Sequence, residues 1–481
     1  MNVGNFIIKE NKIAFLIIIL SFFISISLSN YFINKYDRYE VSTDELETHA
    51  MIKSDLVDYW SNAKIFKKDL NDNKNFISSG NEMWRSYLHE RLIGLYFYVT
   101  DKKMFDNWGI EKYVSLLFNS EDKIRIANGN KYLFLVLQSL LYYFILLFLY
   151  LKIINYYPKK HCICTILFLS VNPNIFTFHS SFFTESIFYS LQLLFIYFLI
   201  DFSYKKKNNF LIGILLGIMF MQKPFVIYFV IPLLVFYLYI FKKKSFLPII
   251  TLMSGYLLIL IFVGVSNYQR IGKFYIMPGM TNYSLYHYVS DNIVSKANNI
   301  SKNEASKIRV RLKDEWIKKN NINLNKETDR LKLYEYFKKY ANQSIIENPI
   351  ISIKYHLYKS LQTGILNPAY IFHFYKNEFR KKPYYFLEES YKSKWLKINI
   401  SYSMFIYFFI ILGFFYSLKE KERLNFKFTL IIVLFSVYLL AVGGWVGVSR
   451  IWNPSLIFFS FLFSNGLLGI FEKKSKLKQT G

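Results

Sequence analysis

The sequence predicts an all-α polytopic membrane protein with about ten transmembrane helices and two large extracytoplasmic loops. Hydrophobic residues make up 53% of the 481 residues, and they are grouped in blocks instead of being spread at a regular period. Blocks such as 13–33, 132–150 and 428–446 run for about 20 residues with almost no charge, the length that an α-helix needs to cross about 30 Å of hydrocarbon. A soluble protein has no use for so many of these blocks.

The distribution of basic residues predicts topology and excludes a nucleic-acid partner. The formal net charge of +27 is large enough for a phosphate-binding surface. Lysines gather, however, at the ends of apolar blocks, at 205–207, 242–244 and 473–478. The positive-inside rule places such groups in the cytoplasm. We therefore expect both termini to be cytoplasmic, with membrane lipids around the spans.

Three parts follow from this pattern. Residues 1–266 form an N-terminal transmembrane module that includes an external loop over 34–130. Residues 267–399 form a second external region, and residues 400–481 hold the last spans and a cytoplasmic tail. The stretch 210–241 is too short for two full-length spans and has lysine groups at both ends, which favours a helical hairpin that turns at Lys223 and Pro224.

The first external loop carries the strongest catalytic candidate. Asp55, Tyr59 and Ala63 are spaced four apart, so on a helix they share one face with the carboxylate at its N-terminal end. An acidic residue in a first helical turn can also be a simple cap or dipole partner. Asp58 lies in the same turn and is the alternative carboxylate.

Four short motifs each lie at the expected outer end of a span. The four are Asp55-x-x-x-Tyr59-x-x-x-Ala63, Asn172-Pro173 with Thr184-Glu185, Gly217 with Lys223-Pro224, and Arg450-x-x-x-Pro454 with Gly466. In residue type and order they resemble the motifs of the GT-C membrane glycosyltransferases, a group that includes protein O-mannosyltransferases and lipid A aminoarabinose transferases. The linker before Asp55 is longer than in many relatives, which leaves Asp37 as a further rival to Asp55.

The resemblance implies an enzyme of a bacterial inner (plasma) membrane with its active site on the extracytoplasmic face. Such a hexosyl- or pentosyltransferase moves a sugar, with inversion, from a polyprenyl-phosphate donor to a glycan, lipid or surface polymer. Asp55 would be the base, and cations at the membrane surface would stabilise the leaving phosphate. Lys223 and Arg450 are the first candidates for that role, with Arg91 and Arg270 next. The substrate-binding candidates together are Tyr59, His89, Glu90, Arg91, Glu185, Lys223, Arg270 and Arg450.

Other interpretations of the same residues stay open. His89 and Glu90 could join an acidic loop residue on a divalent metal. Each basic residue could instead snorkel to the interface, and Glu185 could be a helix-terminal acid that Thr184 caps. A lipid-linked polysaccharide polymerase or ligase would have similar external loops, whereas a transporter should carry charges in mid-span, which this sequence keeps at span ends. The sequence has no P-loop and no Rossmann glycine fingerprint, so the donor should be membrane-resident.

Overall fold

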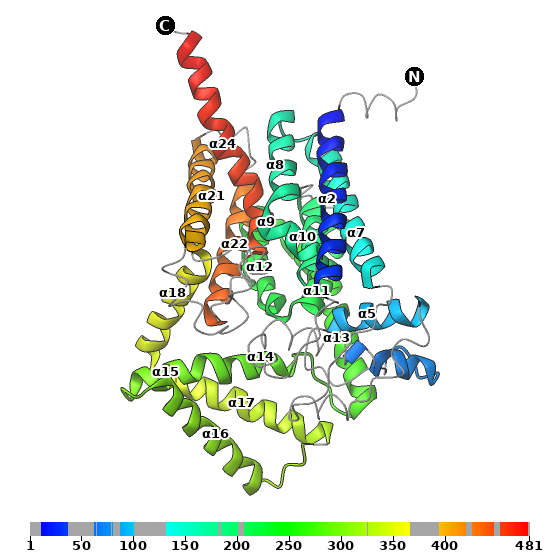
Figure 1. The fold of residues 1–481 in the computed structure, drawn as a ribbon, viewed down its shortest axis with the longest axis vertical. Helices are drawn as coiled ribbons and strands as arrows, with labels where there is room; N and C mark the ends of the chain where they lie inside the picture. The colour runs from blue at the N-terminus through cyan, green and yellow to red at the C-terminus, as the bar shows by residue number, and fades with distance from the viewer. Residues whose placement is uncertain are drawn as a thin grey trace.

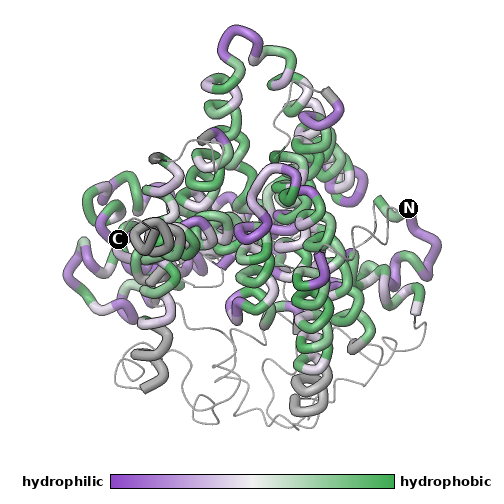
Figure 2. The backbone as a smooth tube through the Cα atoms, turned by 90° about the horizontal axis from the view of Figure 1, so that it is seen from above, coloured by the Kyte–Doolittle hydropathy of each residue, from purple (hydrophilic) through white to green (hydrophobic). Residues whose placement is uncertain are grey.

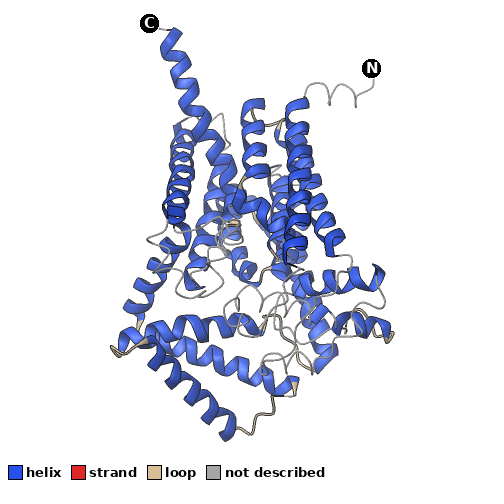
Figure 3. Cartoon of the chain, in the orientation of Figure 1, coloured by secondary structure: helices blue, strands red, loops and turns tan. Residues whose placement is uncertain are grey.

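The structure, a computed structural model, is built from helices that run roughly parallel to one another, with a layer of shorter helices across one end (Figures 1 and 3). It describes residues 11–36, 62–63, 65–77, 79, 87–100, 131–180, 184–200, 206–324, 326–365, 394–419, 426–446 and 453–479. All regular elements in these ranges are helical. The predicted all-α polytopic fold is therefore confirmed.

Within the described ranges, ten helices correspond to the spans that the sequence predicts, and they run roughly along the long axis of the molecule (Figure 1). They are α2 (Lys12–Tyr36), α7 (Lys131–Ile153), α8 (Lys159–Val171), α10 (Glu185–Ile200), α11 (Lys206–Gln222), α12 (Val230–Phe241), α13 (Phe246–Ile271), α21 (Lys394–Lys419), α22 (Phe426–Val446) and α24 (Ser455–Gln479). By length and composition alone, five segments are candidate membrane spans: Lys12–Ser29, Leu133–Ile153, Pro224–Lys244, Phe246–Ile271 and Ile400–Leu418. Three shorter apolar helices, in α10, α22 and α24, accompany them. Seen from above, apolar residues dominate these helices (Figure 2).

Prolines and close helix contacts determine where the chain turns. Helix α8 ends before Pro173, and the chain continues through α9 (Pro173–Phe176) and η1 (Thr177–Ser180) before α10 begins. Helix α11 likewise ends before Lys223-Pro224, and η2 (Pro224–Phe229) leads into α12. Gly213 touches α13 near Leu252, and Gly217 touches it near Ile259, so α11 and α13 run in the same direction. Helix α12 must therefore return between them, which is the predicted hairpin.

A layer of shorter helices lies across the end of the bundle opposite to the start of α2 and the end of α24 (Figure 1). It contains α5 (Tyr87–Thr100) and a set that we call the distal region, residues 272–365. The distal region holds α14 (Gly279–Ser284), the π-helix η4 (Leu285–Val289), α15 (Ser290–Ala297), α16 (Lys302–Lys319), α17 (Glu327–Glu347) and α18 (Pro349–Ile365). The two predicted external loops thus supply the described helices at this end.

Candidate functional site

A buried ion pair joins the distal ends of α10 and α11. Lys223 Nζ lies 2.7 Å from Glu185 Oε1, and the Glu185 side chain is fully buried. Gln222, next to Lys223, donates to the backbone carbonyl of Thr184 at 2.9 Å. Burial makes each charge depend on the other, since an isolated charge in an apolar bundle is very costly. The pair therefore fixes how α10 and α11 meet.

Helix α5 carries three consecutive buried polar residues, one of which connects it to Gln222 beside this pair. His89, Glu90 and Arg91 are all buried although they follow one another in the chain. His89 Nδ1 lies 3.3 Å from Nε2 of Gln222, which connects α5 to α11. Glu90 accepts a hydrogen bond of 2.8 Å from Asn62. The three residues thus point to three different parts of the structure.

Arg91 is the cation that α5 contributes. Its guanidinium donates to the carbonyl of Ser79 at 2.8 Å and to that of Tyr87 at 3.3 Å, and its Cζ lies 3.6 Å from the centre of the Tyr87 ring. Tyr87 in turn donates to Ser266 of α13 at 2.6 Å. These contacts hold the guanidinium in place without neutralising its charge.

Arg270, in the last turn of α13, is a second cation close to Arg91. It donates to Asn267 Oδ1 at 3.2 Å and to the Tyr275 hydroxyl at 2.7 Å. Burial lowers the pKa of Arg91, the nearby Tyr87 and Glu90 act in the opposite sense, and the positive charge of Arg270 lowers it further. Two guanidinium groups are therefore held near each other at the distal end of the bundle.

Neither arginine has a carboxylate partner within 4 Å among the described residues. The Nε atoms of Arg91 and Arg270 are both buried and make no hydrogen bond in the described part of the chain. Lys223 differs, because Glu185 balances its charge. Of the described cations predicted from the sequence, Arg91 and Arg270 are thus the two free to bind an anion such as a phosphate.

The remaining site residues predicted from the sequence lie outside the described residues. They are Asp37, Asp55, Asp58, Tyr59 and Arg450.

Several residues of this site were not predicted from the sequence. These residues, which contact the charged side chains or their neighbours, are Gln222, Asn62, Tyr87 and Ser266. Only their closeness in sequence to Lys223, Ala63, His89 and Arg270 could have suggested them. For a metal, the described residues contain no group of three His, Cys, Asp or Glu side chains that could hold one. The acidic loop residue that the metal hypothesis requires lies outside this part.

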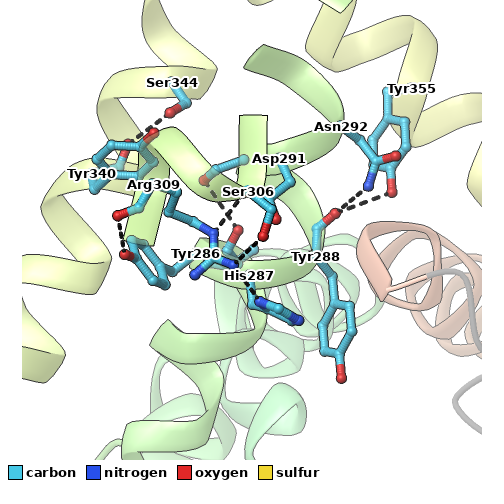
Figure 4. A network of polar contacts seen from close by, with 12 residues as sticks. Tyr286, His287, Tyr288, Asp291, Asn292, Ser306, Arg309, Tyr340, Ser344 and Tyr355 are labelled. Carbon is cyan, nitrogen blue, oxygen red and sulfur yellow. Dashed lines mark hydrogen bonds and ion pairs between the residues drawn. The ribbon is translucent and has the colours of Figure 1, made fainter. Parts of the chain in front are cut away.

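A second polar network lies in the distal region (Figure 4). Arg309 of α16 donates from Nε to Asp291 at 2.6 Å, and its NH2 group lies 2.8 Å from Nδ1 of His287 in the π-helix η4. Burial works against the charged form of Arg309, but its hydrogen bond with Asp291 and that residue's charge outweigh burial and raise its pKa. No sequence motif suggested this network. Its charges are paired, which is typical of a structural connection between α15 and α16.

Comparison with known proteins agrees with this geometry. Residues 123–267, which include Glu185, Lys223 and most of α13 but neither Arg91 nor Arg270, match the sequence model of the dolichyl-phosphate-mannose-protein mannosyltransferase family. The match confirms the resemblance to the GT-C glycosyltransferases. It supports a membrane glycosyltransferase that uses a lipid-linked sugar donor. Comparison with curated proteins gives no match.

The buried ion pair makes a stability prediction. Glu185→Gln or Lys223→Met alone should destabilise the folded protein by about 3–5 kcal/mol, because each variant removes one partner of a buried ion pair. The double variant should recover most of that loss. The measurement is the free energy of unfolding of each of the three variants, purified in mixed micelles.

The exposed pair Arg311–Glu315 on α16 is the matched control for that cycle. Its N···O distance is 3.7 Å and both side chains are more than 60% exposed, so Arg311→Met and Glu315→Gln should each change stability by less than about 1 kcal/mol. Additive losses at Glu185 and Lys223, with no recovery in the double variant, would show that the two residues act independently.

Proposed function

We propose that this chain transfers a sugar, with inversion, from a polyprenyl-phosphate carrier to an extracytoplasmic glycan, lipid or polymer. The observation that carries the proposal is the pair of guanidinium groups of Arg91 and Arg270, held at the distal end of the bundle with no carboxylate within 4 Å in the described part of the chain. A sugar phosphate anchored in the membrane by its lipid would present its charge at such a position. The match over residues 123–267 supports the same class of donor.

The proposed reaction places each residue around the sugar's anomeric carbon. Asp55 accepts the proton of the acceptor hydroxyl while that oxygen attacks the anomeric carbon. The bond from this carbon to the phosphate oxygen breaks, and the electron pair leaves with the phosphate. Arg91 and Arg270 stabilise the charge that develops there, because charge-assisted hydrogen bonds strengthen as the phosphate gains charge.

Helix α5 links the two halves of this proposed mechanism. Arg91 follows Glu90, and Glu90 binds Asn62, which follows Asp55 by only seven residues. A base near the sugar and cations near the phosphate must lie a few ångströms apart around one substrate, so their supports should be connected. In this proposal the Glu185–Lys223 pair supports α5 through Gln222 and His89 and does not bind the phosphate itself.

Membrane orientation follows from the positive-inside rule. Basic residues gather at 242–244 and 473–478, at the ends of α12 and α24 away from the distal region. We place those ends, and both termini, on the cytoplasmic side of a bacterial inner membrane. The site around α5 then lies on the extracytoplasmic face, where a lipid-linked donor and a surface acceptor can meet.

Replacement of Asp55 tests the proposed base. In proteoliposomes supplied with labelled polyprenyl-phosphate sugars and membrane acceptors, Asp55→Asn should lower the transfer rate by about 10²–10⁴-fold, since general-base catalysis contributes that much. Donor binding should stay unchanged. Loss in Asp58→Asn with full activity in Asp55→Asn would move the base to Asp58, and no transfer by the wild type with any donor would contradict the proposal.

Replacement of the two arginines tests the phosphate site separately. Arg91→Met and Arg270→Met should each weaken donor binding by about 10–100-fold, because a hydrogen bond to a charged group contributes about 1.5–3 kcal/mol. The measurement is equilibrium binding of a polyprenyl-phosphate sugar in nanodiscs. Arg311→Met, on the exposed face of α16, is the control and should bind as the wild type does. Unchanged binding in both arginine variants would contradict the phosphate assignment.

A further inference from the structure

Helix α18 of the distal region exposes an apolar stripe along its length. Ile350, Ile353, Leu357 and Leu361 are spaced three or four residues apart, so they lie on one face of the helix. Each is between 58 and 67% exposed. The opposite face is buried, and Tyr355 on that face contacts the backbone carbonyl of Tyr288 in η4. Exposure of such a continuous apolar face to water is unfavourable.

The stripe continues the apolar surface of the transmembrane bundle. Helix α18 packs along α22 and meets the lower end of α21 (Figure 1). Helix α21 contains the candidate span Ile400–Leu418 and exposes large apolar side chains, which include Phe405, Phe408 and Ile411, each more than half exposed. An apolar face that adjoins a membrane span in this way indicates that lipid covers it.

Three lysines gather on the flank of α18. Lys296 Nζ lies 5.6 Å and Lys359 Nζ 5.9 Å from the centre of the same Tyr355 ring. Burial lowers the pKa of Lys359, and the positive charges of Lys302, in the first turn of α16, and of Lys296 lower it further. We call Lys296, Lys302 and Lys359 the lysine cluster.

The lysine cluster places positive charge beside the apolar stripe of α18. Lys296 and Lys302 are both exposed. Basic residues that flank an exposed apolar helix face are the combination that binds the surface of an anionic membrane.

We propose that α18 is an interfacial helix, with its apolar stripe inserted into the acyl region of the leaflet and the lysine cluster bound to anionic lipid headgroups. The distal region is then attached to the bilayer surface through α18 instead of projecting freely into water. This attachment is independent of the proposed sugar transfer, because none of its residues lies among those assigned to the reaction.

Spin labels on α18 test the stripe. With Cys162 and Cys164 replaced by Ser, the full-length chain carries a single label at Ile353→Cys or Leu357→Cys in phosphatidylcholine–phosphatidylglycerol vesicles. Both labels should collide often with oxygen and rarely with a water-soluble nickel chelate, as should a reference label at Phe408→Cys on α21. A reference label at Lys318→Cys, exposed on α16, should show the opposite pattern.

Two results would overturn the assignment of the stripe to lipid. Frequent collision of the α18 labels with the nickel chelate would show that the stripe faces water. Infrequent collision with both reagents would show that protein, such as a second copy of the chain, covers it.

Native mass spectrometry tests the lysine cluster by counting the lipids that the protein retains from the same vesicles. The variant with Lys296, Lys302 and Lys359 changed to Gln should retain at most half as much phosphatidylglycerol as the wild type, with unchanged phosphatidylcholine. Changing Lys313, Lys318 and Lys319 of α16 to Gln removes the same charge and should leave both lipids unchanged. Equal loss in the two triple variants, or no loss in either, would overturn the headgroup assignment.

Discussion

The buried Glu185–Lys223 ion pair is the constraint on which the arrangement of the site depends. Both side chains are buried, and a buried charge costs less when an opposite charge lies beside it. The pair forms only when the start of α10 meets the end of α11. Gln222, beside Lys223, can then reach both the Thr184 carbonyl and His89 of α5. A single electrostatic requirement thus positions three helices at the distal end of the bundle.

The described cations around α5 differ in whether a carboxylate balances their charge, and this difference suggests different roles. Lys223 has a carboxylate partner, whereas Arg91 and Arg270 are held by carbonyls, an amide and a hydroxyl that orient them without reducing their charge. An anion that binds the two arginines would therefore break no ion pair between described residues. Lys223 would have to give up Glu185 first, at a high electrostatic cost.

The fold was largely predictable from the sequence because the membrane imposes length and charge rules on each span. Apolar blocks near 20 residues and lysine groups at their ends predicted ten helices, and Pro224 predicted where α11 turns into α12. The packing of α13 against α11 was not predicted, because it depends on contacts such as Gly213 with the backbone of Leu252, which no periodicity reveals.

The site was predictable only in part. Motif spacing placed Glu185 and Lys223 at the ends of their helices, but it could not show that they bind each other across 38 residues. It ranked Lys223 ahead of Arg91 and Arg270 as a phosphate ligand, because motif spacing does not reveal which charges are balanced by contacts in three dimensions. The Asp291–Arg309 pair and the stripe on α18 likewise depend on which helix faces are covered, and a single sequence carries little information about that.

The position of the donor phosphate tests this account most directly. A polyprenyl-phosphate sugar analogue with a photoreactive diazirine beside the phosphate can be bound to the wild-type protein in nanodiscs, irradiated, and its attachment sites mapped by peptide mass spectrometry. The account predicts labelled peptides from both α5 around Arg91 and the end of α13 around Arg270, with labelling prevented by excess unlabelled donor. Competed labelling confined to α18 or to the cytoplasmic ends of the helices would contradict it.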